Sequence, residues 1–410
     1  MTTLIKPFRG LRPLPARAAA VAAPPYDVLS TEEARARAEN KPHSFLHISK
    51  PEIDLPPGCD PYSAAVYETG ADNLQRLIDG GVLVRDDEPF YYVYRLKMGD
   101  HVQTGFVAAA SVAAYDINRI RKHEFTRPDK EDDRVRQIDA LNAQTGPVLL
   151  FYRAAPSLQA ILEKVASGTP LYNVTADGVV HTLWPVLDAG QIAQITKLVD
   201  AMPALYIADG HHRSAAASRV AAARRGKVKD TDSHEYFLTV MFPHDQMRIF
   251  DYNRVVKDLN GLTPPAFVAQ VEKNFSSVVA TQQVKPDRPG RFGMYLGGQW
   301  RQLDIRAELI PTNDPVARLD VSLLQAYLID PILGIKDPRR DKRIDFVGGI
   351  RGLGELEKRV DSGEMAVAFA LHPTTLDQLM AVADANEVMP PKSTWFEPKL
   401  ADGFVSHVLD

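Results

Sequence analysis

The sequence has almost no cysteine and no long apolar run. Cys59 is the only cysteine in 410 residues, so an intrachain disulfide is excluded, and a lone thiol is typical of a reducing compartment. No segment reaches the ~18 consecutive apolar residues of a membrane-spanning helix. In the basic N-terminal stretch, Pro13, Pro15 and Arg17 interrupt the apolar run that a secretory signal requires. We therefore expect a cytoplasmic protein with no membrane partner.

An excess of charge of one sign is also missing. The formal net charge is −4, from 48 basic and 52 acidic residues, which provides no global field for gripping nucleic acid. We expect no nucleic-acid partner, although the sequence does not exclude a local basic groove. It does not exclude a homodimer either. Hydrophobic residues make up 45% and charged residues 24% of the chain, as is usual for soluble globular proteins. Intrinsic disorder and fibrous repeats are thereby excluded.

Several well-known catalytic patterns are absent. The sequence contains no Gly-x-Gly-x-x-Gly after a strand, no Gly-x-Ser-x-Gly nucleophile elbow and no Walker A loop. A zinc site built on cysteines is excluded by the cysteine count, whereas a site of histidines and carboxylates is not. Any catalytic site must therefore be built from other residues.

Hydrophobic periodicity predicts an α/β chain, more narrowly mixed α+β. Helical spacing occurs at 62–78, 129–142, 189–202, 214–225 and 321–328, and strand-like runs occur at 90–96, 104–113, 148–152, 204–208, 235–242, 292–296, 299–305 and 365–371. The Gly99-Asp100 pair predicts a hairpin, which argues against a purely parallel sheet. We expect an N-terminal region, residues 1–260, with the nucleotide-binding core, and a C-terminal α+β region, residues 261–410, whose tail folds back on the site.

The clearest candidate site is a polar run between the predicted strand 204–208 and the Ala-rich helix that follows. The run consists of Asp209, Gly210, His211, His212 and Arg213. A helix N-terminus offers free amides and a favourable dipole to anions, phosphate above all, and an exposed arginine can grip phosphate through two hydrogen bonds. The carboxylate at 209 is suited to Mg²⁺ or to a substrate hydroxyl. The alternative is an ordinary helix cap beside surface side chains.

A second polar run lies where residues 121–128 lead into the predicted helix 129–142. We interpret Glu124 as a general base or metal ligand and four neighbours as substrate-binding residues: His123, Thr126, Arg127 and Arg134. His123 and Glu124 are adjacent in an extended segment and so point to opposite faces, which is not a metal pair. A solvated helix start is the alternative.

Three further segments are candidates. Asp27 follows Pro24-Pro25-Tyr26, and the prolines reduce the entropy cost of fixing a catalytic carboxylate. Asn253 and Arg254 follow a strand-like run and are suited to a carboxylate or phosphate. A proline-framed segment with an aromatic pair is interpreted as a substrate-binding loop, and it contains Lys392, Ser393 and Thr394.

Together these motifs resemble the family called domain of unknown function 1015. The shared pieces are Pro24–Val28, the His123–Thr126 segment with Asp133-Arg134, Asp209–Arg213, and Pro391–Thr394 with Glu397-Pro398-Lys399. They occur in the family's order over nearly the whole chain. The Asp209–Arg213 segment also resembles a loop of the ParB/sulfiredoxin-like superfamily, which includes nucleotide-dependent free-serine kinases, sulfiredoxin and CTP-binding ParB clamps.

This second resemblance implies a ParB/sulfiredoxin-like core in which Gly210, His211, His212 and Arg213 hold nucleotide phosphates. We interpret the chain as an enzyme, an ATP- or ADP-dependent kinase of a small hydroxylated metabolite, with free L-serine as a candidate acceptor. Asp209 and Glu124 would hold Mg²⁺, and Glu124 or Asp27 would take the proton. The alternatives are a nucleotide-gated binding module and a metal-dependent phosphoester hydrolase.

Overall fold

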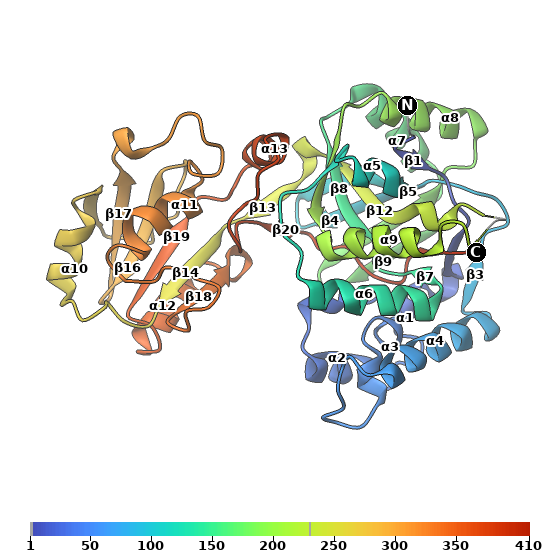
Figure 1. The fold of residues 1–410 in the computed structure, drawn as a ribbon, viewed down its shortest axis with the longest axis horizontal. Helices are drawn as coiled ribbons and strands as arrows, with labels where there is room; N and C mark the ends of the chain where they lie inside the picture. The colour runs from blue at the N-terminus through green and yellow to red at the C-terminus, as the bar shows by residue number, and fades with distance from the viewer. Residues whose placement is uncertain (1–2, 229–230) are drawn as a thin grey trace. The chain divides into compact units, whose positions relative to one another are not determined.

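The computed structural model describes residues 3–228 and 231–410, and the chain divides into two compact units (Figure 1). The first unit comprises Met1–Met247 and Pro398–Asp410, and the second comprises Arg248–Glu397. The fold is mixed α+β, as the sequence predicts. Residues 398–410 therefore belong to the first unit although the second unit precedes them in the chain.

A mixed sheet of nine strands forms the centre of the first unit. Its order is β6 (Ile120–Arg121), β11 (Leu205–Asp209), β8 (Val148–Tyr152), β12 (Tyr236–Pro243), β5 (His101–Ser111), β4 (Tyr92–Met98), β10 (Val179–Pro185) and β9 (Tyr172–Ala176), with β1 (Ile5–Lys6) paired to β5. The pairs β11–β6 and β12–β8 are parallel, and the others are antiparallel. Strands β4 and β5 form the hairpin predicted at Gly99-Asp100.

Helices α7 (Pro156–Ala166) and α8 (Ala189–Asp200) cover this sheet, and α5 (Val112–Asp116) follows β5 directly. Leu158 and Leu162 of α7, with Ile195 and Val199 of α8, are buried in one core with strand residues such as Ile207. Burying an aliphatic side chain of this size contributes about 1.5–3 kcal/mol each, so this core fixes the sheet and the strand β11 within it.

Helices α6 (Pro128–Leu141) and α9 (His211–Arg224) pack side by side (Figure 1). The Ala-rich sequence of α9 favours a helix and lets it approach α6 closely, where Ile138 lies against Ala216 and Val220. The remaining helices of this unit are α1 (Ala18–Val21), α2 (Thr31–Ala38), α3 (Leu46–Ser49) and α4 (Ala64–Asp79). A four-stranded sheet joins β3 (Leu83–Arg85), β2 (Gly10–Pro13), β21 (Ser406–Val408) and β7 (Ala143–Gln144).

The second unit is built on a six-stranded antiparallel sheet. Its strands, in order, are β15 (Phe275–Ala280), β17 (Gln299–Ile305), β16 (Arg291–Leu296), β19 (Val367–Leu371), β14 (Tyr252–Val256) and β18 (Ile344–Gly348). Strands β13 (Arg248–Phe250) and β20 (Trp395–Glu397) pair separately. The helices are α10 (Pro264–Val271), α11 (Asp320–Leu324), α12 (Gly354–Asp361) and α13 (Leu376–Asp384). Within the described residues of both units, no helix is long and apolar enough to cross a membrane.

One difference from the predicted elements bears on the candidate site. The predicted helix 214–225 begins at His211 in the structure. Both histidines and the arginine of the polar run therefore lie in the first turn of α9 and not in a loop before it. Gly210 makes this early start possible because its φ of 98° turns the chain directly from β11 into the helix.

The packing of the central sheet predicts a large effect at Gly105 in β5. An added β-carbon would lie 2.0 Å from the carbonyl oxygen of Met241, so Gly105→Ala should lower the free energy of unfolding by about 1–3 kcal/mol or more through overpacking. Gly168→Ala is the control, because its β-carbon meets only Val165 at 3.4 Å. Urea denaturation of both variants tests this, and equal stabilities would contradict the strand packing described here.

Candidate functional site

The turn between β11 and α9 is the first feature of the site. Asp209 ends β11 beside an irregularity in its pairing with β8, a feature common next to functional sites. Position 210 requires glycine for two reasons. Its φ is 98°, and a β-carbon there would lie 3.1 Å from Nε of Arg213. No side chain caps the N-terminus of α9. The first turn of the helix therefore presents backbone amides and the positive end of the dipole.

The two histidines of this turn hold the 123–127 segment. Nε2 of His211 accepts a hydrogen bond from the amide of His123 at 3.4 Å, and Nε2 of His212 accepts one from the amide of Arg127 at 3.0 Å. Nδ1 of His211 lies 3.5 Å from a carboxylate oxygen of Glu124. Burial lowers the pKa of His211 well below its usual range and that of His123 to about 4. The rings of His211 and His123 are therefore neutral at pH 7 and add no positive charge to the site.

Arg213 supplies the positive charge instead, from a buried position. Its side chain is 12% exposed, so the exposed arginine that the sequence suggests is wrong. Nη1 donates a hydrogen bond to the carbonyl of Pro147, and Nη2 lies 3.7 Å from Asp209 and 3.8 Å from Asp27. Although burial disfavours the charged form, the two carboxylates outweigh it and raise the pKa of Arg213. The guanidinium thus joins two predicted catalytic carboxylates from distant segments.

The pKa of Asp209 shifts in the opposite direction for the same reason. Burial would raise it, but the charges of Arg213 and Lys399 prevail and lower it. Asp209 is therefore ionised at pH 7, and its side chain remains 42% exposed. A charged, accessible carboxylate beside uncapped helix amides is suited to a cation or a hydroxyl donor.

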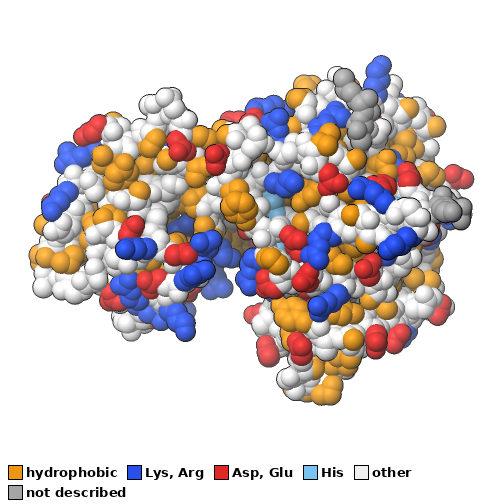
Figure 2. Space-filling model, in the orientation of Figure 1, with side chains coloured by type: hydrophobic (Ala, Val, Ile, Leu, Met, Phe, Trp, Pro, Cys, Tyr) orange, Lys and Arg blue, Asp and Glu red, His pale blue; other side chains and the backbone are white. Residues whose placement is uncertain are grey.

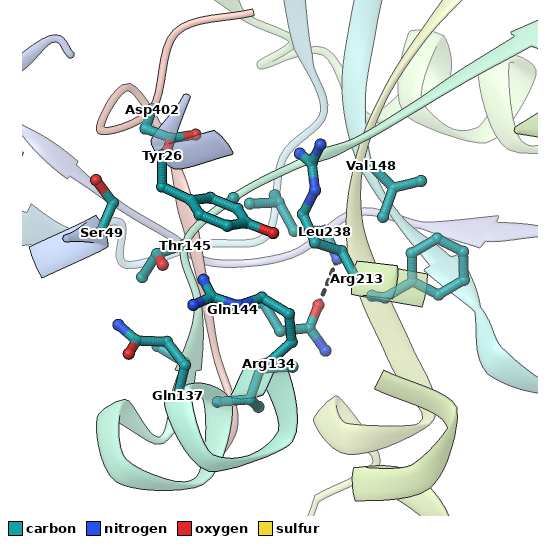
Figure 3. A pocket seen from close by; sticks show the side chains of 14 residues that line it. Tyr26, Ser49, Arg134, Gln137, Gln144, Thr145, Val148, Arg213, Leu238 and Asp402 are labelled. Carbon is teal, nitrogen blue, oxygen red and sulfur yellow. Dashed lines mark hydrogen bonds between the residues drawn. The ribbon is translucent and has the colours of Figure 1, made fainter. Parts of the chain in front are cut away.

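A pocket lies behind Arg213 and contains residues that sequence reasoning missed (Figure 3). Arg134 pairs with Asp133 at 2.7 Å and lies over the ring of Tyr26, 4.1 Å from its centroid. Asp402 is 2% exposed. Burial raises the pKa of Asp402 to about 7, which Arg213 opposes. The sequence signal for Asp402 is an Asp-Gly pair within an otherwise apolar stretch, residues 400–405.

The other predicted residues of the first unit have local partners. The hydroxyl of Thr126 donates a hydrogen bond to Glu131, and Arg127 is exposed and pairs with Asp129 at 2.8 Å. His123 is 3% exposed and packs edge to face on His211 with ring centroids 4.5 Å apart. These contacts build the segment that carries Glu124, and their roles in substrate binding stay a prediction.

The predicted residues of the second unit converge around Arg254. Nη2 of Arg254 donates to the carbonyl of Lys392 at 3.0 Å, and its guanidinium lies over the ring of Phe346. Asn253 is buried within the sheet, where its Oδ1 accepts from the amide of Leu371. Ser393 donates to the carbonyl of Pro390, and Thr394 follows it directly. These contacts organise the 390–394 segment within the second unit.

The candidate metal ligands are Asp209 and Glu124. Among residues 3–228 and 231–410, no group of three or more His, Cys, Asp or Glu is arranged to hold a metal ion. Mg²⁺ in phosphoryl-transfer sites is usually held by one or two carboxylates together with substrate phosphates and waters. Asp209 and Glu124 would supply two carboxylates of this kind, and their role as metal ligands stays a prediction.

Charges of both signs lie on the face of the first unit that Figure 2 shows. On the face shown in Figure 2, Lys and Arg side chains lie interspersed with Asp and Glu. On this face, the positive charge of individual side chains is offset by neighbouring carboxylates.

The chain matches a family described as "Protein of unknown function (DUF1015)" over residues 5–322. No curated protein matches it. Among solved structures, it is similar to a free serine kinase in complex with AMP, with 13% identity, a TM-score of 0.36, and coverage of 71% of this chain and 86% of the other.

Two further solved structures are similar at the same distance. SbnI with a C-terminal truncation from Staphylococcus aureus has 10% identity, a TM-score of 0.38, and coverage of 72% of this chain and 84% of the other. A conserved hypothetical protein from Pyrococcus furiosus has 12% identity, a TM-score of 0.34, and coverage of 73% and 94%. Similarities this distant carry no argument about activity.

The buried carboxyl of Asp402 predicts a pH dependence of stability. In the folded protein it holds its proton up to about pH 7, whereas an unfolded aspartate titrates near ~3.9. The folded state therefore binds more protons between these values, and this contribution to stability, complete below about pH 4, is lost as the pH rises through about 7. It amounts to about 4 kcal/mol.

Asp402→Asn removes this titration. The free energy of unfolding of the variant minus that of the wild type should rise by up to about 4 kcal/mol between pH 4 and pH 8. Denaturation curves across that range measure the difference, in which the other titrating groups cancel. A difference that does not change with pH would mean that Asp402 is ionised throughout.

Proposed function

The chain belongs to the DUF1015 family, and we propose that its first unit binds the phosphates of ATP or ADP at the start of α9 and transfers a phosphoryl group to a small hydroxylated metabolite. The observation that carries the proposal is the turn at Gly210. There a positive φ leads directly into a helix with no side-chain cap, with Arg213 inside its first turn. Helix N-termini of this kind are effective sites for phosphate.

Phosphoryl transfer depends mainly on positioning and on neutralising charge. In this proposal, the amides of residues 211–213 face the phosphates, and the helix dipole adds favourable charge. Asp209 and Asp27 keep Arg213 positively charged, so its guanidinium adds a positive electrostatic potential at this turn. The neutral rings of His211 and His212 position the 123–127 segment rather than bind phosphate themselves.

The exposed carboxylates of Asp209 and Glu124 have the two remaining roles, which are metal binding and proton transfer. Asp209 and Glu124 are suited to hold Mg²⁺, which when bound would neutralise phosphate charge. Glu124 also has a side chain that is 55% exposed and lies beside His211, so we assign it as the base that takes the proton of the acceptor hydroxyl. Asp27 is the second candidate, and its carboxylate lies 3.8 Å from Nη2 of Arg213.

The full-length protein incubated with ATP or ADP, Mg²⁺ and a mixture of hydroxylated metabolites including L-serine tests this function. Phosphorus NMR and mass spectrometry should detect a phosphorylated acceptor. Phosphate release that does not require an acceptor would instead identify a hydrolase, with water as the acceptor. Nucleotide binding without turnover would identify a binding module.

Glu124→Gln should lower the rate of transfer by about 10²–10⁴-fold, the usual contribution of a general base, while the Kd for ADP measured without Mg²⁺ changes less than twofold. The control is Arg219→Ala in α9, because Arg219 pairs with Glu131 and Asp132 away from the first turn. Calorimetry and initial rates separate the two effects. Unchanged turnover in the Glu124 variant would indicate that Asp27, and not Glu124, is the base.

A further inference from the structure

The pocket beside Arg213 is lined by hydrogen-bond donors to which the proposed function gives no role (Figure 3). Its polar lining includes Ser49, Arg134, Thr145 and Arg213. We propose that this pocket binds the carboxylate group of the acceptor, so that the substrate is a small hydroxylated carboxylic acid. The assignment of the bound molecule as acceptor rests on the proposed function, whereas the carboxylate site itself does not.

The first argument is the unused donors. Ser49 is 6% exposed, and its buried hydroxyl has no hydrogen-bond partner, which is unfavourable unless a ligand or water supplies one. Arg134 uses Nε and Nη2 for Asp133, and no hydrogen bond within the described residues involves its Nη1. Nη2 of Arg213 is beyond hydrogen-bonding distance of Asp209 and Asp27. A carboxylate, which only accepts hydrogen bonds, is the kind of group that such donors recognise.

The second argument is size. The cavity has a volume of about 30 Å³, and one water needs roughly 10–15 Å³ on that measure. The space therefore suits the few heavy atoms of a carboxylate and excludes a nucleoside. A tetrahedral phosphate is larger and would have to push the lining apart. The rest of the acceptor must extend out of the cavity.

The third argument is the local charge. Two guanidinium groups, those of Arg134 and Arg213, line the pocket, whereas the carboxylates paired with them do not. Asp402 would repel an anion if it were ionised, but its burial keeps it largely protonated up to about pH 7. Its proton is then one more donor toward the ligand. Tyr26 closes the pocket through its ring over Arg134.

The fourth argument is location. Arg213 belongs both to the pocket and to the first turn of α9. An acceptor held by its carboxylate in this pocket is therefore close to the proposed phosphate site. Positioning of this kind is what phosphoryl transfer requires.

Ligand-observed saturation-transfer NMR of glycolate and glycerol on the full-length protein tests the site, with inorganic phosphate, which has no observable proton, added as a competitor of glycolate. We expect glycolate to bind, and to bind more tightly than neutral glycerol or the larger phosphate. Ser49→Ala should raise the Kd for glycolate about tenfold, because a hydrogen bond to a charged group contributes that much. Arg134→Gln should raise it further.

Ser322→Ala is the matched control, because the Ser322 hydroxyl is also buried without a partner but lies in the second unit. It should leave glycolate binding unchanged. If Arg134→Gln does not fold, the Ser49 and Ser322 variants decide the question. Equal affinity for glycerol, tighter binding of phosphate, or glycolate binding that Ser49→Ala leaves intact would each overturn the proposal.

Titration with ADP on the same samples separates this inference from the proposed function. Glycolate binding without any ADP binding leaves the carboxylate site intact and removes the kinase. ADP binding without glycolate binding overturns the carboxylate site and leaves nucleotide binding standing.

Discussion

A guanidinium buried in the first turn of a helix has to be balanced, and the balance of Arg213 determines the arrangement of the site. The helix dipole and the uncapped amides already make this end of α9 positive, so a further buried cation there is costly without nearby carboxylates. Asp209 and Asp27 provide them, from the end of β11 and from the N-terminal segment. The carbonyl of Pro147 adds a neutral acceptor from the segment that leads into β8. One side chain thus draws together parts of the chain more than a hundred residues apart.

The histidines of the same turn have a different role from the one their chemistry first suggests. A charged imidazole is a good phosphate ligand, but burial lowers the pKa of His211 and keeps its ring neutral. Neutral rings have acceptor nitrogens, and these are used by the amides of His123 and Arg127. The histidines thereby fix the segment that presents Glu124. Burial thus removes the charge of these rings and leaves their nitrogens as hydrogen-bond acceptors for the backbone.

The chain order of the first unit explains why its pocket has contributions from both ends of the sequence. Residues 398–410 return to the first unit after the whole of the second, and they bring Asp402 against the segment that carries Tyr26. The pocket is therefore complete only when residues 398–410 have packed onto the rest of the first unit. A C-terminal truncation removes a buried carboxyl and one strand of the four-stranded sheet together.

The sequence alone determined the mixed α+β class, the β4–β5 hairpin, most elements of the central sheet, and the importance of Asp209–Arg213, because these depend on local periodicity, turn residues and the order of strand and helix. It could not determine that α9 starts at His211, since that depends on how Gly210 packs between Arg213 and β8. Burial was also out of reach, because Arg213 and His211 resemble surface residues by type. His123 packs on His211, and segments distant in the sequence surround Arg213, and only these tertiary contacts remove the two side chains from water. Asp402 shows the same limit most clearly, because a carboxyl with a pKa near 7 is a property of its tertiary surroundings and not of the Asp-Gly pair in which it occurs.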